Sequence, residues 1–162
     1  MLRLEYTSRN SYPIHMALKN NATLDVIRVL ANCDETILQT QDKSDKTALS
    51  IALQYRAKTE VINWILATDP TLLKIPDFRM NLPLHIVCKY GCDEDILETL
   101  LLNSESDVNM KNRDGETPLD LACRSTKYSD NMIDVLRKYE LEGYNQIDNA
   151  IDFCHKVNNT FF

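Results

Sequence analysis

Apolar residues recur along the chain in a pattern that repeats every 35 residues. A six-residue motif begins at Tyr12, Thr47, Leu82 and Thr117, and its third, fifth and sixth positions are apolar in every copy. The apolar positions continue at spacings of three and four residues, which places them on one face of a short helix. Proline occupies the second motif position in three of the four copies, where the first turn of a helix tolerates a missing N–H. Each copy therefore predicts the start of a helix.

A second apolar set follows each motif about fourteen residues later and predicts a second amphipathic helix. Neither helix of a pair can bury its apolar stripe alone, so neighbouring pairs must stack into a continuous core. The pattern therefore predicts an all-α solenoid. Three sets share one register and the fourth is displaced by one residue: Val26, Ile27, Leu30; Val61, Ile62, Ile65; Ile96, Leu97, Leu100; and Met132, Ile133, Leu136.

A polar stretch with turn-forming residues separates the helix pairs and is clearest at residues 107–116. Within it, Gly115 supplies the positive φ that a tight hairpin turn requires. The positions in register with Gly115 hold Asn10, Asp45 and Met80. Asn and Asp tolerate the left-handed region, whereas Met80 is either strained there or belongs to a different turn.

Two stretches carry a family resemblance. The segment Asp107–Ala122 and the tetrapeptide Leu82-Pro83-Leu84-His85 resemble the ankyrin repeat, and the resemblance covers roughly residues 3 to 138. It implies an all-α ankyrin-repeat solenoid of about four helix-turn-helix units with connecting β-hairpin loops. Residues 139–162 depart from the pattern, and apolar residues on one helical face there predict a C-terminal capping helix followed by a tail. The expected divisions are four repeats in residues 1–138, at about 3–37, 38–72, 73–107 and 108–138, and the cap at 139–162.

Composition narrows the class of protein. A chain of 162 residues with 44% hydrophobic content is long enough for one domain with a sizeable core. The formal net charge of -6 argues against general binding to nucleic acid, which needs a basic surface. No apolar stretch approaches the roughly 20 residues that a membrane span requires, and the first residues do not resemble a signal peptide. We therefore expect a cytoplasmic protein, or a nuclear one, whose five cysteines are reduced.

The residues that catalysis or metal binding would use do not form a recognisable set. His15 and His85 occupy the fourth motif position, where the resemblance to ankyrins implies hydrogen bonds to the backbone of adjoining hairpins. A structural zinc site needs four ligands, and Cys88 lies in an apolar column beside the turn residue Cys92. We therefore predict no catalytic residue, no metal and no cofactor, and a protein that is not an enzyme.

The resemblance places partner binding on a concave face made of hairpin tips and the ends of the first helices. Eight positions of this face are basic and two, Asp114 and Glu116, are acidic, although the whole chain is acidic. Either the face is merely solvated, or it takes an acidic or phosphorylated partner segment. Its aromatic residues are either half-buried packing or contact residues. The predicted partner-binding residues are Lys43, Lys46, Tyr55, Phe78, Arg79, Lys89, Tyr90, Arg113 and Arg124.

The leading hypothesis for function is thus a non-catalytic module that binds another protein, without nucleic acid or membrane. The alternative is a targeting fragment of a larger ankyrin-containing enzyme such as a kinase. One residue is also a candidate for modification. Asn109, with Leu101, Asp107 and Val108 before it, resembles the pattern recognised by the asparaginyl hydroxylase that modifies ankyrin hairpins. The other interpretation is that Asn109 is an ordinary turn residue.

Overall fold

The structure is a computed structural model that describes residues 12–34, 36–103, 107–128, 130 and 132–141. Its helices follow one another in short antiparallel pairs, as the apolar pattern predicts. Residues 132–141 are also helical and follow the last labelled helix. The labelled helices are α1 (Pro13–Lys19) with α2 (Leu24–Cys33), α3 (Ala48–Gln54) with α4 (Thr59–Thr68), the 3-10 helix η1 (Pro70–Lys74), α5 (Pro83–Tyr90) with α6 (Glu94–Asn103), and α7 (Pro118–Arg124).

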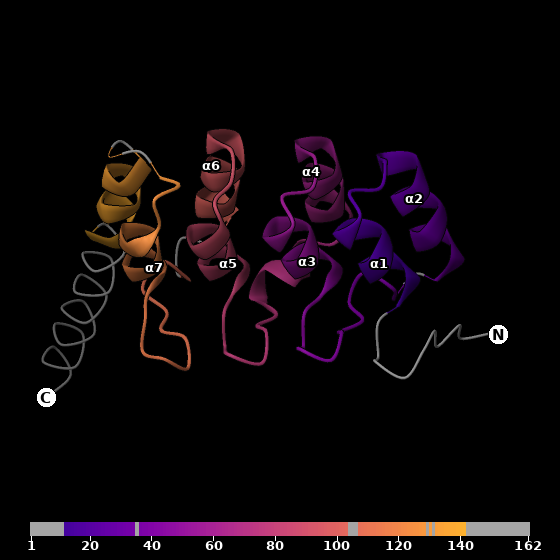
Figure 1. Cartoon of the computed structure of the whole chain (residues 1–162), viewed down its shortest axis with the longest axis horizontal. Coiled ribbons are helices and arrows are strands. Elements are labelled where there is room, and N and C mark those ends of the chain that lie inside the picture. The colour runs from indigo at the N-terminus through magenta and orange to yellow at the C-terminus, as the bar shows by residue number, and fades with distance from the viewer. Residues whose placement is uncertain (1–11, 35, 104–106, 129, 131, 142–162) are drawn as a thin grey trace, which may run out of the picture.

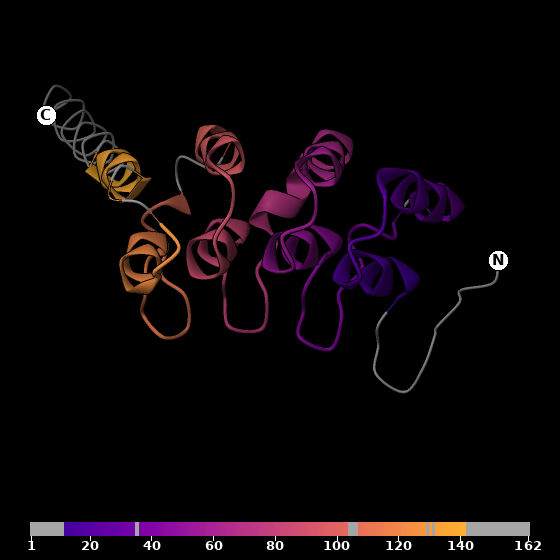
Figure 2. The same cartoon turned by 45° about the horizontal axis from the view of Figure 1, so that its top comes forward.

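The pairs stand in a row and form two layers (Figure 1). Helices α1, α3, α5 and α7 pack against one another in chain order, and α2, α4 and α6 form the second layer. Figure 2 shows that the loops between pairs project from the first layer, on the side away from the second helices. This is the all-α repeat architecture that the sequence predicts.

The predicted apolar columns form the core. In the first layer, Ile14, Leu49 and Leu84 are at most 1% exposed. In the second layer Val26 is 46% exposed, but Ile27, Ile62 and Leu97 are at most 3% exposed. Such side chains each contribute roughly 1.5–3 kcal/mol through removal of apolar area from water. Stacking of neighbouring pairs therefore supplies most of the stability of the solenoid.

The segments between a second helix and the next loop are also anchored in the core. In the second of them, η1 begins after Asp69, whose carboxylate accepts hydrogen bonds from the backbone N–H and the hydroxyl of Thr71. The same arrangement joins Asp34 and Thr36 in the first. Each segment then buries apolar side chains, namely Ile37 and Leu38, Leu72 and Leu73, and Val108 in the third.

The loops turn tightly where the register predicts a positive φ. Asp45, Met80 and Gly115 have φ values of 55°, 61° and 78°. Met80 therefore adopts the left-handed conformation despite its side chain, and it accepts the strain that glycine at position 115 avoids. Backbone hydrogen bonds close each turn, for example from the N–H of Met80 to the carbonyl of Asp77. No β-strand occurs in the described residues, so strand pairing in these loops is not confirmed.

The predicted C-terminal cap and tail at 139–162 lie almost entirely outside the described residues, which end at Leu141. Residues 139–141 continue the helix of residues 132–138, instead of opening a separate element.

Candidate functional site

The loop tips that form one edge of the first layer are shaped by one side chain each. The side-chain oxygen Oδ1 of Asp77 accepts hydrogen bonds from the backbone N–H groups of Arg79 and Asn81, both at 2.9 Å. Asp42 and Asn112 do the same for the preceding and following loops, at 2.8–3.2 Å and 2.9–3.0 Å. These bonds hold each tip in one conformation, because they satisfy backbone donors that the tight turn would leave unpaired.

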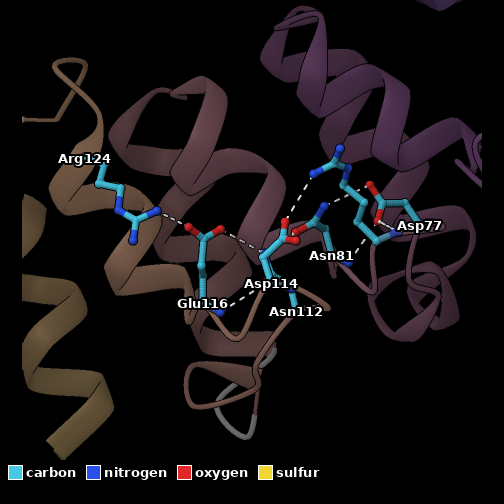
Figure 3. Close-up of polar contacts among 7 residues, drawn as sticks. Asp77, Asn81, Asn112, Asp114, Glu116 and Arg124 are labelled. Atoms are coloured by element: carbon cyan, nitrogen blue, oxygen red, sulfur yellow. Dashed lines mark hydrogen bonds and ion pairs between the residues drawn. The ribbon is translucent and has the colours of Figure 1, made fainter.

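Neighbouring tips are joined by hydrogen bonds. The backbone N–H of Phe78 donates to the carbonyl of Ser44 at 3.1 Å, and that of Arg113 donates to Arg79 at 2.8 Å. The amide of Asn112 adds a side-chain bond to Asn81 at 2.9 Å (Figure 3). The tips of the three described loops therefore form one continuous surface.

The two motif histidines tie the helices to these loops. The Nε2 atom of His15 lies 3.1 Å from the carbonyl oxygen of Thr40, and that of His85 lies 2.9 Å from the carbonyl of Met110. Each Nδ1 accepts from the backbone N–H of the residue before its helix, so Nε2 carries the proton and donates. Burial lowers the pKa of both imidazoles, which keeps them neutral. The structural role that we expected for both residues is confirmed.

Part of the predicted binding face forms a pocket between the loop before α3 and the loop before α5. Its volume is about 250 Å³, and it lies where the tip after η1 meets the end of α5. Five of the nine predicted partner-binding residues line it, together with Asp77, Asn81 and Ile86. The five are Lys46, Phe78, Arg79, Lys89 and Tyr90.

Two aromatic rings in this pocket each form a cation–π contact. The guanidinium of Arg79 lies 5.5 Å from the ring centroid of Phe78, and the ammonium of Lys89 lies 5.9 Å from that of Tyr90. Phe78 is 44% exposed, whereas Tyr90 is half-buried and packs against the core. The ring of Phe78 is therefore available for contact with a partner, whereas the ring of Tyr90 also packs against the core.

The basic charges of the face are partly neutralised by neighbouring carboxylates. Arg79 pairs with Asp114 at 3.2 Å, and Arg124 pairs with Glu116 (Figure 3). Both acidic residues belong to the loop before α7, so the excess of positive charge decreases toward the C-terminal end of the described surface. The sequence predicts the sum of these charges but not their pairing.

The remaining predicted residues lie outside the pocket. Lys43 and Arg113 are exposed on the loop tips, and Tyr55 is 42% exposed at the end of α3. Arg124 is the last residue of α7, which packs against α5, and it does not line the pocket. The structure therefore brings five of these residues together and leaves four along the same surface.

The Asn109 side chain makes a long-range contact. Its Nδ2 atom donates to the backbone carbonyl of Glu140 at 3.4 Å, while its Oδ1 is buried without a protein partner among the described residues. This contact agrees with a structural role. Hydroxylation stays a prediction, and mass spectrometry of the native protein would test it through one added oxygen on the peptide that contains Asn109.

Within the described residues, no group of three or more His, Cys, Asp or Glu side chains could hold a metal ion. None of the described helices is long and apolar enough to cross a membrane. Cys88 is buried, and burial raises the pKa of its thiol well above the ordinary value, as expected for an inert core cysteine.

Sequence reasoning missed the residues that shape the loops. Asp42, Asp77 and Asn112 stand 35 residues apart, and their residue types are those that bond to backbone N–H groups two positions later. The register that revealed the apolar columns would have revealed this polar column. Nothing in the sequence indicates that Gln54 accepts a hydrogen bond from Lys46, because that contact depends on rotamers.

The comparisons with known proteins agree with this geometry. No curated protein matches the chain. Residues 65–122 match the family model described as ankyrin repeats (many copies), over α5, α6 and most of α7. Helix pairs of the same kind continue before the matched segment at the same 35-residue spacing. Repeats of this family generally act as modules for protein–protein interaction. The chain therefore contains ankyrin repeats.

Proposed function

We propose that this protein is a non-catalytic interaction module that binds a partner protein through its loop tips and first helices. The observation that carries the proposal is the pocket at the loops before α3 and α5, which collects Lys46, Phe78, Arg79, Lys89 and Tyr90. Aromatic and arginine residues in a concave site are typical of binding hot spots. The proposal holds equally if the repeats target a larger enzyme such as a kinase, because the surface would be the same.

The rigidity of the surface supports this proposal. The tips are closed by side-chain hydrogen bonds and linked by backbone hydrogen bonds, as from Phe78 to Ser44. A preformed surface loses little conformational entropy when a partner binds. Such a surface is suited to recognition of an extended segment that lies across several loops.

The charge of the surface favours a partner segment that is acidic or phosphorylated. Lys43, Lys89 and Arg113 form no ion pair with any described residue, and all three are exposed. Unpaired surface cations attract an anionic partner and raise its association rate. This attraction weakens as salt concentration rises.

The test requires a partner identified by proximity labelling and then purified. Binding of this partner is measured by calorimetry for Phe78→Ala and Arg79→Glu. Matched controls are Leu102→Ala, which truncates an exposed apolar residue of α6, and Glu98→Lys, which reverses an exposed charge on α6. We expect Phe78→Ala to cost about 2 kcal/mol and Arg79→Glu to cause a loss that shrinks in high salt. Equal affinity for the loop variants and the α6 controls would contradict the proposal.

A further inference from the structure

The carboxylates near the pocket already form hydrogen bonds or ion pairs within the protein. Asp77 is 5% exposed, and it accepts hydrogen bonds from the backbone of Arg79 and Asn81 and from the side-chain amide of Asn81. Asp114 is paired with Arg79. The negative charge around the pocket therefore shapes the loop or balances Arg79, and the two lysines of the pocket lack a close anionic partner among the described residues.

Lys46 is held in the wall of the pocket with unused donors. Its side chain is half-buried, and its ammonium donates one hydrogen bond, to Oε1 of Gln54. An ammonium group has three N–H donors, so two remain for another acceptor. Burial lowers the pKa of Lys46, with Asp77 and Asp42 opposing the shift and Lys19 and Lys89 adding to it. An anion beside Lys46 would offset the cost of burying its charge.

Lys89 also lines this pocket. It occupies the last turn of α5, its side chain is exposed, and its ammonium rests over the ring of Tyr90. Contact with an aromatic ring leaves the N–H donors of the ammonium available to a ligand. The pocket thus has an ammonium group from the loop before α3 and another from the end of α5.

We propose that this pocket receives one anionic side chain of the partner segment, a carboxylate or a phosphate, between Lys46 and Lys89, while Phe78 contacts an apolar neighbour of that side chain. The pocket volume of about 250 Å³ suits a single side-chain group rather than a drug-sized ligand. The inference rests on the proposed function and assigns its specificity to two lysines, because Arg79 is already paired with Asp114.

The experiment is a ¹H–¹⁵N NMR titration of the full chain at constant ionic strength with three small probes. Phenyl phosphate and phenylacetate offer the two anionic groups beside a ring, and benzamide is the neutral control. We expect shift changes at residues 46, 77–81 and 86–90 with at least one anionic probe. Dissociation constants should be on the order of millimolar, as for fragments of this size.

Three lysine variants complete the design. Lys46→Met and Lys89→Met keep the aliphatic stem and remove the charge, and Lys58→Met is the control because Lys58 is exposed in the turn before α4. Each pocket variant should weaken anion binding by about tenfold or more, which corresponds to about 1.4 kcal/mol, whereas the control should not. Spectra of the variants without probe show whether each is folded. If one pocket variant does not fold, the other still tests the role of the pocket in anion binding.

The probes also distinguish the source of the anion. Binding of phenyl phosphate alone supports a phosphorylated segment, and binding of phenylacetate as well supports an acidic one. Absence of binding, equal binding of benzamide, or equal binding by the lysine variants would overturn the pocket assignment. If the pocket fails these tests while Phe78→Ala still weakens the partner, the proposed function stands and only this inference falls.

Discussion

The first and third helix pairs share the same opening motif but lie in different surroundings. Both open with proline, an apolar residue and histidine, and both histidines reach a carbonyl of the next loop. Their equivalent apolar positions nevertheless differ in burial. Met16 and Val26 of the first pair are 51% and 46% exposed, whereas Ile86 and Ile96 of the third are 2% and 1% exposed.

The difference comes from the neighbours of each pair. The third pair packs between the second pair and α7, whereas no helix pair precedes α1 within the described residues. The first pair therefore keeps large apolar side chains exposed, namely Met16, Val26 and Val29. Sequence in register therefore specifies which side chains can be buried, and the adjoining repeat decides whether they are.

The largest expected effect is a difference between two identical substitutions. Leu100 and Leu30 occupy the same register position, but Leu100 is fully buried and Leu30 is half-buried. Leu100→Ala should lower the free energy of unfolding by about 3–5 kcal/mol, because it leaves a cavity in the core. Leu30→Ala should cost about 1–2 kcal/mol. Urea unfolding followed by circular dichroism measures both, and equal losses would show that burial in the two pairs is the same.

The comparison also explains how much the sequence could predict. Helix pairs, their spacing and the positive φ of Asp45 and Gly115 follow from local rules that act within one repeat. The burial of Ile96 and the exposure of Val26 depend on contacts between repeats, which one register position cannot reveal.

The candidate site follows the same division. Sequence register places Phe78 on the loop tips, because that position is fixed by the repeat. It does not reveal that Asp114 pairs with Arg79 or that Lys46 and Lys89 share a pocket. It also does not reveal that neither lysine forms an ion pair with a described residue. Ion pairs such as that of Arg79 with Asp114 join different repeats through flexible side chains, so their partners cannot be deduced from the sequence.

A smaller effect is expected in the turns between the helices of these two pairs. Asn21 has φ 52°, which Asn tolerates, whereas Gly91 has φ 83° and ψ 150°, a region almost confined to glycine. A Cβ at position 91 would also lie 2.9 Å from Cδ of Lys127, whose ammonium donates to the carbonyl of Tyr90. Gly91→Ala should cost about 1–3 kcal/mol.

Asn21→Ala is the matched substitution in the first pair. It should cost about 1 kcal/mol or less, because the backbone there lies in the ordinary left-handed region and Asn already has a Cβ. Thermal and urea unfolding of both variants gives the comparison. A loss at position 21 as large as that at position 91 would mean that contact with Lys127 adds nothing.

The smallest effect should be alike in the two pairs, because it depends on a contact that each makes in the same way. His15 and His85 are fully buried, and burial lowers the pKa of each imidazole below the ordinary 6.5. The unfolded chain therefore takes up protons at higher pH than the folded chain, so the contribution of the histidines to stability is complete above pH 6.5 and decreases as pH falls below it.

His85→Gln should lower the free energy of unfolding by about 1–2 kcal/mol at pH 7.5 and by less at pH 5.5, where the wild type has already lost part of this contribution. His15→Gln should show the same dependence, since its two hydrogen bonds match those of His85. Urea unfolding at both pH values measures these differences, and a cost that does not change with pH would show that neither imidazole resists protonation in the folded state.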